Sequence, residues 1–99
     1  MFFTKINSIS TQELADKMQK EKLYIIDVRE KDEYASGHIK GAINMPLSNI
    51  NAYTLSSNAY IICQSGMRSR NASKHFIKKG YNVVNVSGGM SAWKGPVVK

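Results

Sequence analysis

The fold of this chain is decided around the stretch AYIICQSGMRS, which occupies residues 59 to 69. Its first part is a short apolar run rich in strand-forming residues, and its second part is a glycine-containing loop that leads into helical spacing. A buried strand followed by a tight loop and a helix is typical of an α/β domain with a mainly parallel sheet. Cys63, the only cysteine, stands where the strand meets the loop.

The segments on either side of this stretch repeat the alternation of strand and helix. Apolar runs predict strands at 23–28, 42–45, 59–63 and 83–86. Helical spacing predicts helices at 11–20, 29–34 and 69–79, with one or two helical turns at 47–53 and a brief segment after Gly88-Gly89. Ser10 and Glu13 form a capping box before the first helix, and Ser69 is the expected cap of the third. In parallel sheets, sites lie at the carboxyl ends of the strands, where Cys63 stands.

Length and composition predict one ordinary globular domain. The chain has 99 residues, of which 42% are hydrophobic and 21% charged. No apolar run approaches the ~20 residues that a membrane helix requires, and residues 1–5 lack the apolar core of a secretory signal. A single cysteine excludes an intramolecular disulfide and fits the reducing cytoplasm, which is the expected location.

The net charge of +7 suggests two classes of binding partner, which are nucleic acids and small anions. The basic residues are spread along the chain, although several gather between residues 68 and 79. The sequence has neither the interleaved aromatic residues of an RNA-binding signature nor the cysteine and histidine spacing of a zinc finger. A small anionic substrate is therefore favoured over nucleic acid. One cysteine with two distant histidines is a poor zinc set, so no metal or organic cofactor is expected.

Cys63 is well placed to exist as a thiolate. Backbone N–H groups of the following loop can point inward, and the helix start adds positive potential. Lowering a thiol pKa from about 8.5 to below about 7 requires roughly 2 kcal/mol, of which a helix end supplies ~0.3–1 kcal/mol. Several loop N–H groups must contribute the remainder. The alternative is that Cys63 is a buried apolar residue of the core. The loop that follows favours a reactive cysteine over this alternative.

Four local patterns occur in order: DVRE at 27–30, GHIKGAINMP at 37–46, CQSGMRS at 63–69, and Gly88-Gly89 followed by Trp93. Together they closely resemble the rhodanese (thiosulfate sulfurtransferase-like) domain family in its single-domain form, over residues 6 to 93. The resemblance implies an α/β domain spanning residues 1–99, with a parallel five-stranded sheet flanked by helices on both faces. It also implies that Cys63 carries a persulfide during turnover.

The length of the loop bears on the chemistry independently of the family. Cysteine phosphatases use Cys-x5-Arg, whose extra residue widens the cradle for a phosphoryl group. Here four residues separate Cys63 from Arg68, and the shorter loop favours a sulfane sulfur on the thiolate over a phosphate. Phosphatase activity is therefore the less favoured alternative.

The loop supplies the candidate substrate-binding residues, which are Gln64, Ser65, Gly66, Met67, Arg68 and Ser69. The planar fork of Arg68 suits a sulfonate or thiosulfonate edge, and the alternative is that it pairs with a nearby carboxylate and holds the loop. Gly66 provides a backbone angle that glycine adopts easily. The others act mainly through N–H groups, while their side chains line the mouth of the site.

Asp27 and Arg29 end the strand beside Cys63 and are candidate supporting residues. They either shape the floor of the pocket or form an internal ion pair in which Arg29 reaches Glu33, and the second interpretation is favoured. His38 resembles a family histidine with a structural role, and a general-base role is less favoured. His75, on a helix among lysines, is expected to be solvated, and residues 94–99 are expected to form a short tail.

These observations predict a cytoplasmic sulfurtransferase that works by double displacement through Cys63. The expected partners are a small anionic sulfur donor such as thiosulfate and a thiol or cyanide-like acceptor, with another sulfur-carrier protein as a further candidate. The alternative from another class is a rhodanese-like interaction or redox-sensing module without turnover. Retention of Cys63 together with Gly66 and Arg68 favours the enzyme.

Overall fold

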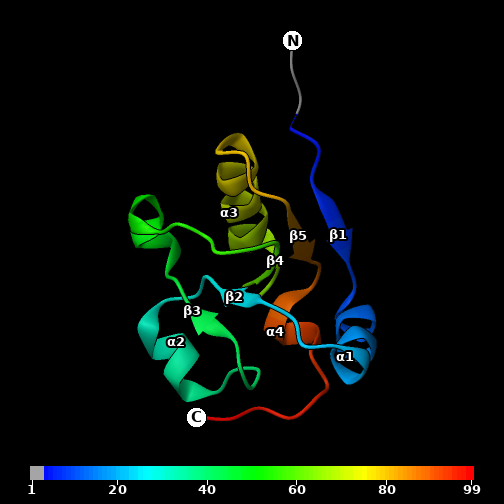
Figure 1. Cartoon of the computed structure of the whole chain (residues 1–99). Helices are drawn as coiled ribbons and strands as arrows, with labels where there is room; N and C mark the ends of the chain where they lie inside the picture. Colours follow the sequence, from blue (N-terminus) through cyan, green and yellow to red (C-terminus); the bar gives the residue numbers. More distant parts are fainter. Residues whose placement is uncertain (1–3) are drawn as a thin grey trace.

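A computed structural model describes residues 4–99, and Met1–Phe3, part of the segment considered for a targeting signal, lie outside the described residues. One five-stranded parallel sheet runs through the middle of the molecule (Figure 1). Its order is β1-β5-β4-β2-β3, with β1 at Asn7–Ile9, β2 at Ile25–Asp27, β3 at Ile43–Asn44, β4 at Ala59–Ile62 and β5 at Val83–Val86. The parallel sheet expected from the alternation is confirmed. The edge strand β1 had no apolar run to predict it, because two of its three residues are exposed.

The helical segments are α1 (Thr11–Lys20), α2 (Lys31–Ser36), the 3₁₀ segment η1 (Leu47–Ala52), α3 (Met67–Lys78) and α4 (Gly89–Ala92). The predicted capping box is present, since the Ser10 hydroxyl accepts from the Glu13 N–H and the Glu13 carboxylate accepts from the Ser10 N–H. The prediction that Ser69 caps α3 is wrong. Gly66, with φ +106°, is the cap, so α3 begins two residues earlier and Ser69 lies inside its first turn.

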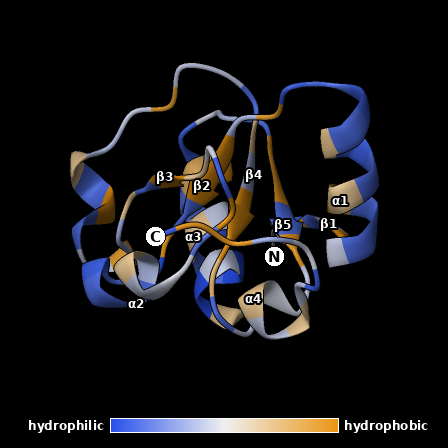
Figure 2. Cartoon of the chain, turned by 90° about the horizontal axis from the view of Figure 1, so that it is seen from below, coloured by the Kyte–Doolittle hydropathy of each residue, from blue (hydrophilic) through white to orange (hydrophobic). Residues whose placement is uncertain are grey.

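Helices cover both faces of the sheet, as expected. Phe76 of α3 and residues of η1 pack on one face, against Ile26, Ile61 and Val83. Leu14 of α1 packs on the other face with Ile25, and Met90 of α4 lies against the same cluster. Figure 2 shows hydrophobic strands at the centre and a hydrophilic outer side of α1. The sheet is thus shielded on both sides, which accounts for its nearly continuous apolar strands.

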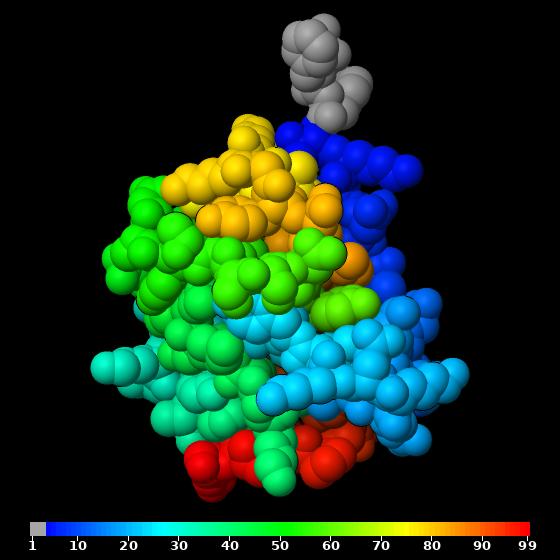
Figure 3. Space-filling view, in the orientation of Figure 1, coloured from blue at the N-terminus to red at the C-terminus, as the bar shows by residue number. Residues whose placement is uncertain are grey.

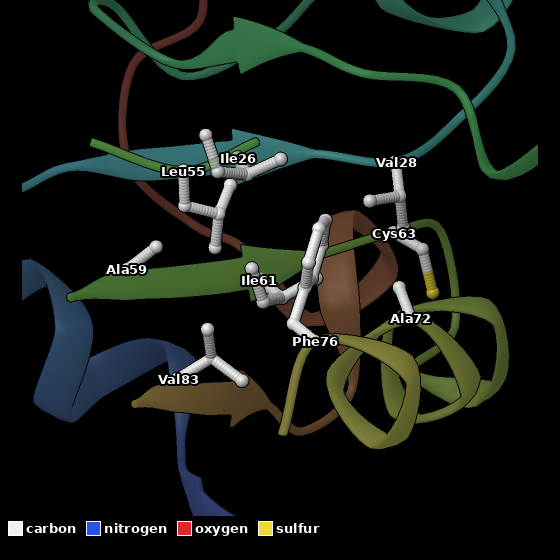
Figure 4. Packing of buried hydrophobic residues seen from close by; sticks show 9 residues of the cluster. All are labelled: Ile26, Val28, Leu55, Ala59, Ile61, Cys63, Ala72, Phe76 and Val83. Atoms are coloured by element: carbon white, nitrogen blue, oxygen red, sulfur yellow. The ribbon is translucent and has the colours of Figure 1, made fainter. Parts of the chain in front are cut away.

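The alternation of side chains along β4 determines where Cys63 points. Ile61 and Cys63 belong to the cluster under α3, whereas Ile62 between them belongs to the opposite cluster. Figure 4 shows the sulfur of Cys63 directed towards the first turns of α3, beside Ala72. The thiol therefore lies at the carboxyl end of the core, between the sheet and the start of a helix.

The C-terminal segment, expected to form a short tail, is bonded to the rest of the domain. The backbones of His38 and Val98 exchange two hydrogen bonds, of 2.9 and 2.8 Å, and the Trp93 indole donates to the Pro96 carbonyl. Figure 3 shows this segment, in red, packed along the bottom of the molecule. Within residues 4–99, no helix combines the length and the apolar character needed to span a membrane.

Candidate functional site

The Cys63 side chain is fully buried, and polar groups of the loop and of α3 contact its sulfur. The Gly66 N–H donates to Sγ over 3.0 Å. The Ser69 hydroxyl lies 3.4 Å from Sγ, close enough for a hydrogen bond to sulfur. A thiol enclosed in this way differs from an apolar filler, because polar groups contact its sulfur directly.

Two opposing effects act on the pKa of the Cys63 thiol. Burial, the largest, raises the pKa, since it disfavours the charged thiolate. Hydrogen bonds donated to the thiolate form by the Ser69 hydroxyl and by the N–H groups of Ser69, Gly66 and Ser65 lower the pKa, and together they outweigh burial. The net result is a pKa below the ordinary thiol value, as the sequence predicted for a loop whose N–H groups point inward.

The loop is held in shape by the N-terminus of α4. The N–H groups of Met90 and Ser91 donate to the carbonyls of Cys63 and Gln64, over 2.8 and 2.9 Å. This contact requires that Gly89 lie directly on the loop. A Cβ at position 89 would overlap the carbonyl oxygen of Cys63 and lie 2.7 Å from the carbonyl carbon of Gln64. The Gly88-Gly89 pattern thus has a physical role, which is to let α4 approach the loop backbone.

The Arg68 side chain extends away from the Cys63 loop and binds a carboxylate on α2. Its Nη1 and Nη2 donate to the two carboxylate oxygens of Glu33, over 2.5 and 2.8 Å, and both side chains are about one-third exposed, at 35%. This bidentate pair joins the start of α3 to α2. The geometry corresponds to the loop-holding alternative for Arg68, although its charge also acts on Cys63.

The same pair makes stability depend on pH. The hydrogen bond from Arg68 lowers the pKa of Glu33 to about 2 from an ordinary 4.5. A carboxyl with a depressed pKa contributes stability above its unfolded-state pKa and loses it as pH falls through the folded-state value. We expect Glu33→Gln to reduce the fall in the free energy of unfolding between pH 4.5 and pH 2, measured by urea denaturation.

The matched control is Asp32→Asn, an exposed carboxylate one residue away that makes no salt bridge within residues 4–99. This variant should keep the fall seen in the parent protein. An unchanged fall in Glu33→Gln would show that the Arg68 pair contributes little in solution, as many exposed ion pairs do.

Asp27 and Arg29 form a buried ion pair, with Arg29 only 3% exposed. The Arg29 guanidinium donates to both carboxylate oxygens of Asp27, with a shortest distance of 2.8 Å. The internal ion pair that the sequence favoured is present, but the partner expected for Arg29 was wrong. Glu33 is held by Arg68, whereas Arg29 also contacts the Gln64 side chain over 3.4 Å and so reaches the loop.

The remaining loop side chains line the mouth in different ways. Gln64 bridges the mouth, since its amide also donates to the Ser91 hydroxyl over 3.1 Å. Ser65 is exposed, and Met67 is 74% exposed. Ser69 is fully buried beneath the loop and bonds to Asn85 of β5.

Two residues of this site, Asn85 and Ser91, were not predicted, and Glu33 was predicted only as a partner of Arg29. Asn85 did carry a signal, because it is a lone amide within the apolar run of β5. Glu33 carried a weaker one, as the N3 residue of a capping box whose N-cap is Glu30. Ser91 had none, since only the fold brings it to Gln64.

The family model described as Rhodanese-like domain matches residues 10–96, which include the Cys63 loop and the Gly89 contact. The chain belongs to the rhodanese-like domain family. It is 44% identical over 96 residues to a Bacillus subtilis (strain 168) protein named "Putative sulfurtransferase YtwF", an alignment covering 92% of this chain and 93% of that one. It is 31% identical over 99 residues to "Thiosulfate sulfurtransferase GlpE" of Pseudoalteromonas translucida (strain TAC 125), covering 95% of this chain and 91% of that one.

Among solved structures, the fold resembles a rhodanese-like domain protein from Staphylococcus aureus. The TM-score is 0.80 at 36% sequence identity, and the match covers 92% of this chain and 93% of that one. The family match over residues 10–96 includes strands β2 to β5, the loop and α4. The resemblance drawn from four short patterns is therefore confirmed at the level of the family and the fold.

The two histidines of this rhodanese-like domain contact other groups than the Cys63 sulfur. His38 stacks on Tyr34 at a centroid distance of 3.6 Å, and its Nδ1 lies 2.8 Å from the Tyr34 carbonyl oxygen. His75 is half-buried and packs edge-on against Phe76, so the expectation that it is solvated was wrong. The sulfur is contacted by Gly66 and Ser69 instead.

Proposed function

We propose that this protein is a sulfurtransferase that carries the transferred sulfur as a persulfide on Cys63. The observation that carries the proposal is the cradle around the thiol. The N–H groups of Ser65, Gly66 and Ser69 face the sulfur at a carboxyl strand end, and the Ser69 hydroxyl lies 3.4 Å from it. Preorganised donors of this kind stabilise an anion without reorganisation, and they suit both a thiolate and a persulfide anion.

The first step is attack of the Cys63 thiolate on the sulfane sulfur of a donor such as thiosulfate. A bond forms between Sγ and the sulfane sulfur, while the sulfur–sulfur bond of thiosulfate breaks and its electron pair leaves with sulfite. The product, Cys63–S–S⁻, retains the single negative charge of the starting thiolate. No proton is transferred, so the step needs no separate base if the thiol is already ionised.

In the second step an acceptor thiolate or cyanide attacks the outer sulfur. The new bond forms to the acceptor, and the electron pair of the persulfide bond returns to Cys63 as a thiolate. The outer sulfur leaves as an acceptor persulfide or as thiocyanate. The second step regenerates the thiolate, so the two steps form a closed cycle. The cycle consumes no oxidant or reductant besides the sulfur donor and the acceptor.

We assign Arg68 to hold the loop, since both of its terminal nitrogens bind Glu33. Its positive charge also acts on Cys63 and favours an anionic donor near the mouth. Gln64 and Met67 stand at the mouth, and their side chains are suited to influence which acceptor enters. A free thiol that must stay reduced fits the cytoplasm, where we place the reaction.

Turnover of two substrate classes tests this function. We expect the protein to form thiocyanate from thiosulfate and cyanide, and to leave an aryl phosphate unhydrolysed, because four residues between Cys63 and Arg68 make a narrow cradle. Aryl phosphate hydrolysis without thiocyanate formation would replace the proposal with a phosphatase. The absence of both activities, with intact folding, would favour a non-catalytic interaction or redox-sensing module.

A further inference from the structure

Behind the Cys63 thiol lies a polar chain that is buried from Cys63 to Asn85 and reaches the exposed Ser8. It runs from the Cys63 sulfur through the Ser69 hydroxyl to the Asn85 side chain and ends at Ser8 on β1. Ser69 is fully buried and Asn85 is 4% exposed. We propose that Asn85 is a positioning residue that draws the Ser69 hydroxyl proton away from the Cys63 sulfur, and so opposes formation of the thiolate.

The Ser69 hydroxyl has a single proton to donate. Its oxygen lies 2.5 Å from Asn85 Oδ1, 3.1 Å from the Gly66 carbonyl oxygen and 3.4 Å from Cys63 Sγ. The first two groups can only accept a hydrogen bond. One proton cannot serve three acceptors, and Asn85 is the nearest. In the resting site the hydroxyl therefore donates to Asn85 and presents lone pairs to the sulfur.

The other end of the amide fixes its orientation. Asn85 Nδ2 faces the hydroxyl of Ser8 at 3.5 Å, which leaves Oδ1 directed at Ser69. Asn85 stands in β5 between Val84 and Val86, where an amide has no packing advantage over an apolar residue. A buried amide in a strand normally requires partners, and its partners here lead to the thiol.

This geometry separates two states of the site. A neutral Cys63 thiol donates its own proton to the Ser69 lone pair, and the Ser69–Asn85 bond is kept. A thiolate needs the Ser69 proton to turn towards sulfur, which deprives Asn85 Oδ1 of its buried partner. An unpartnered buried acceptor is unfavourable, so Asn85 biases the site towards the thiol.

Few other charged groups lie near the polar chain that runs from Cys63 to Ser8. Arg68 precedes Ser69 on α3 and is paired with Glu33, while Asp27 and Arg29 on the β2 side are paired with each other. Strand β1 contributes no titratable side chain, since its residues are Asn7, Ser8 and Ile9. The bias from Asn85 therefore acts against a fixed background of two ion pairs.

The effect of Asn85 on thiolate formation should differ between the two steps of sulfur transfer, and this part of the inference rests on the proposed function. A thiol of higher pKa is a stronger nucleophile once ionised, but a poorer leaving group from a persulfide. Below the thiol pKa, the smaller thiolate fraction offsets the gain in nucleophilicity, so the main effect of Asn85 would be to help Cys63 retain sulfur and to slow its discharge. At a pH where Cys63 is fully ionised, loss of Asn85 should speed the second step and slow the first.

The test replaces Asn85 with leucine and follows the pH dependence of Cys63 alkylation by iodoacetamide, with thiolate absorbance as a second readout. We expect Asn85→Leu to raise the thiolate fraction about tenfold at a pH below the thiol pKa, which is one unit of pKa. The control is Asn82→Leu, an exposed asparagine just before β5, which should follow the parent curve.

A double variant shows whether Asn85 acts through Ser69. Ser69→Ala removes the contested proton and should lower the thiolate fraction, and Ser69→Ala/Asn85→Leu should then match Ser69→Ala alone. If Asn85→Leu does not fold, Asn85→Ala gives the same comparison. An unchanged or lower thiolate fraction in the folded Asn85 variants would overturn the proposal. Alkylation uses no sulfur donor, so failure of the sulfurtransferase function would leave this result interpretable.

Discussion

The Cys63→Ser variant should fold and lose all transfer of sulfur from thiosulfate to cyanide. A serine hydroxyl is far less acidic than a thiol, so it is not ionised in this cradle and cannot carry a persulfide. Thiocyanate formation should fall to the uncatalysed level. Because Ser can accept the Gly66 N–H bond in place of the sulfur, burial of its hydroxyl should cost only roughly 1–3 kcal/mol of stability.

Thermal unfolding of the same preparation separates chemistry from folding. A folded, inactive variant supports Cys63 as the sulfur carrier. Thiocyanate formation at the parent rate in the Cys63→Ser variant would contradict the assignment outright. An unfolded variant would instead make Cys63 a structural residue of the core under α3, to which it also belongs.

Gly89→Ala should reduce activity by about 100-fold, because displacement of a catalytic group by about 1 Å has effects of this size. The new methyl group would overlap the Cys63 carbonyl and collide with Gln64, so the loop or α4 must move. The hydrogen bonds from Met90 and Ser91 to the loop carbonyls would be strained or lost. The N–H groups facing the sulfur would then no longer converge.

Gly80→Ala is the matched control for this variant. Both glycines have positive φ, +54° at Gly89 and +96° at Gly80, so both substitutions impose backbone strain of about 1–2 kcal/mol. A methyl group at Gly80 meets nothing within 4 Å, so this variant should be less stable but fully active. Equal activity in the two variants would show that contact between α4 and the loop does not position the site.

The parts of the fold that could be predicted are those governed by local pattern. Continuous apolar runs predicted β2, β4 and β5 because strands covered on both faces have no polar side to interrupt them. The capping box predicted α1 because Ser10 and Glu13 are close in sequence. Cys63 could be placed at a strand end for the same local reason.

The parts that could not be predicted depend on contacts distant in sequence. Arg68 and Glu33 are 35 residues apart, and only the packing of α2 beside the loop brings them together. Ser69 and Asn85 are 16 residues apart. Because serine commonly caps helices, the sequence favours Ser69 as the cap, yet Gly66 with its positive φ is the cap and α3 begins earlier.

Intact-mass measurement of the protein after incubation with thiosulfate and removal of excess reagent tests the central claim most directly. We expect an added mass of one sulfur atom on the parent protein, which is lost again on treatment with cyanide, and no added mass on the Cys63→Ser variant. An unchanged mass for the folded parent protein, or an identical addition to the serine variant, would contradict a persulfide on Cys63.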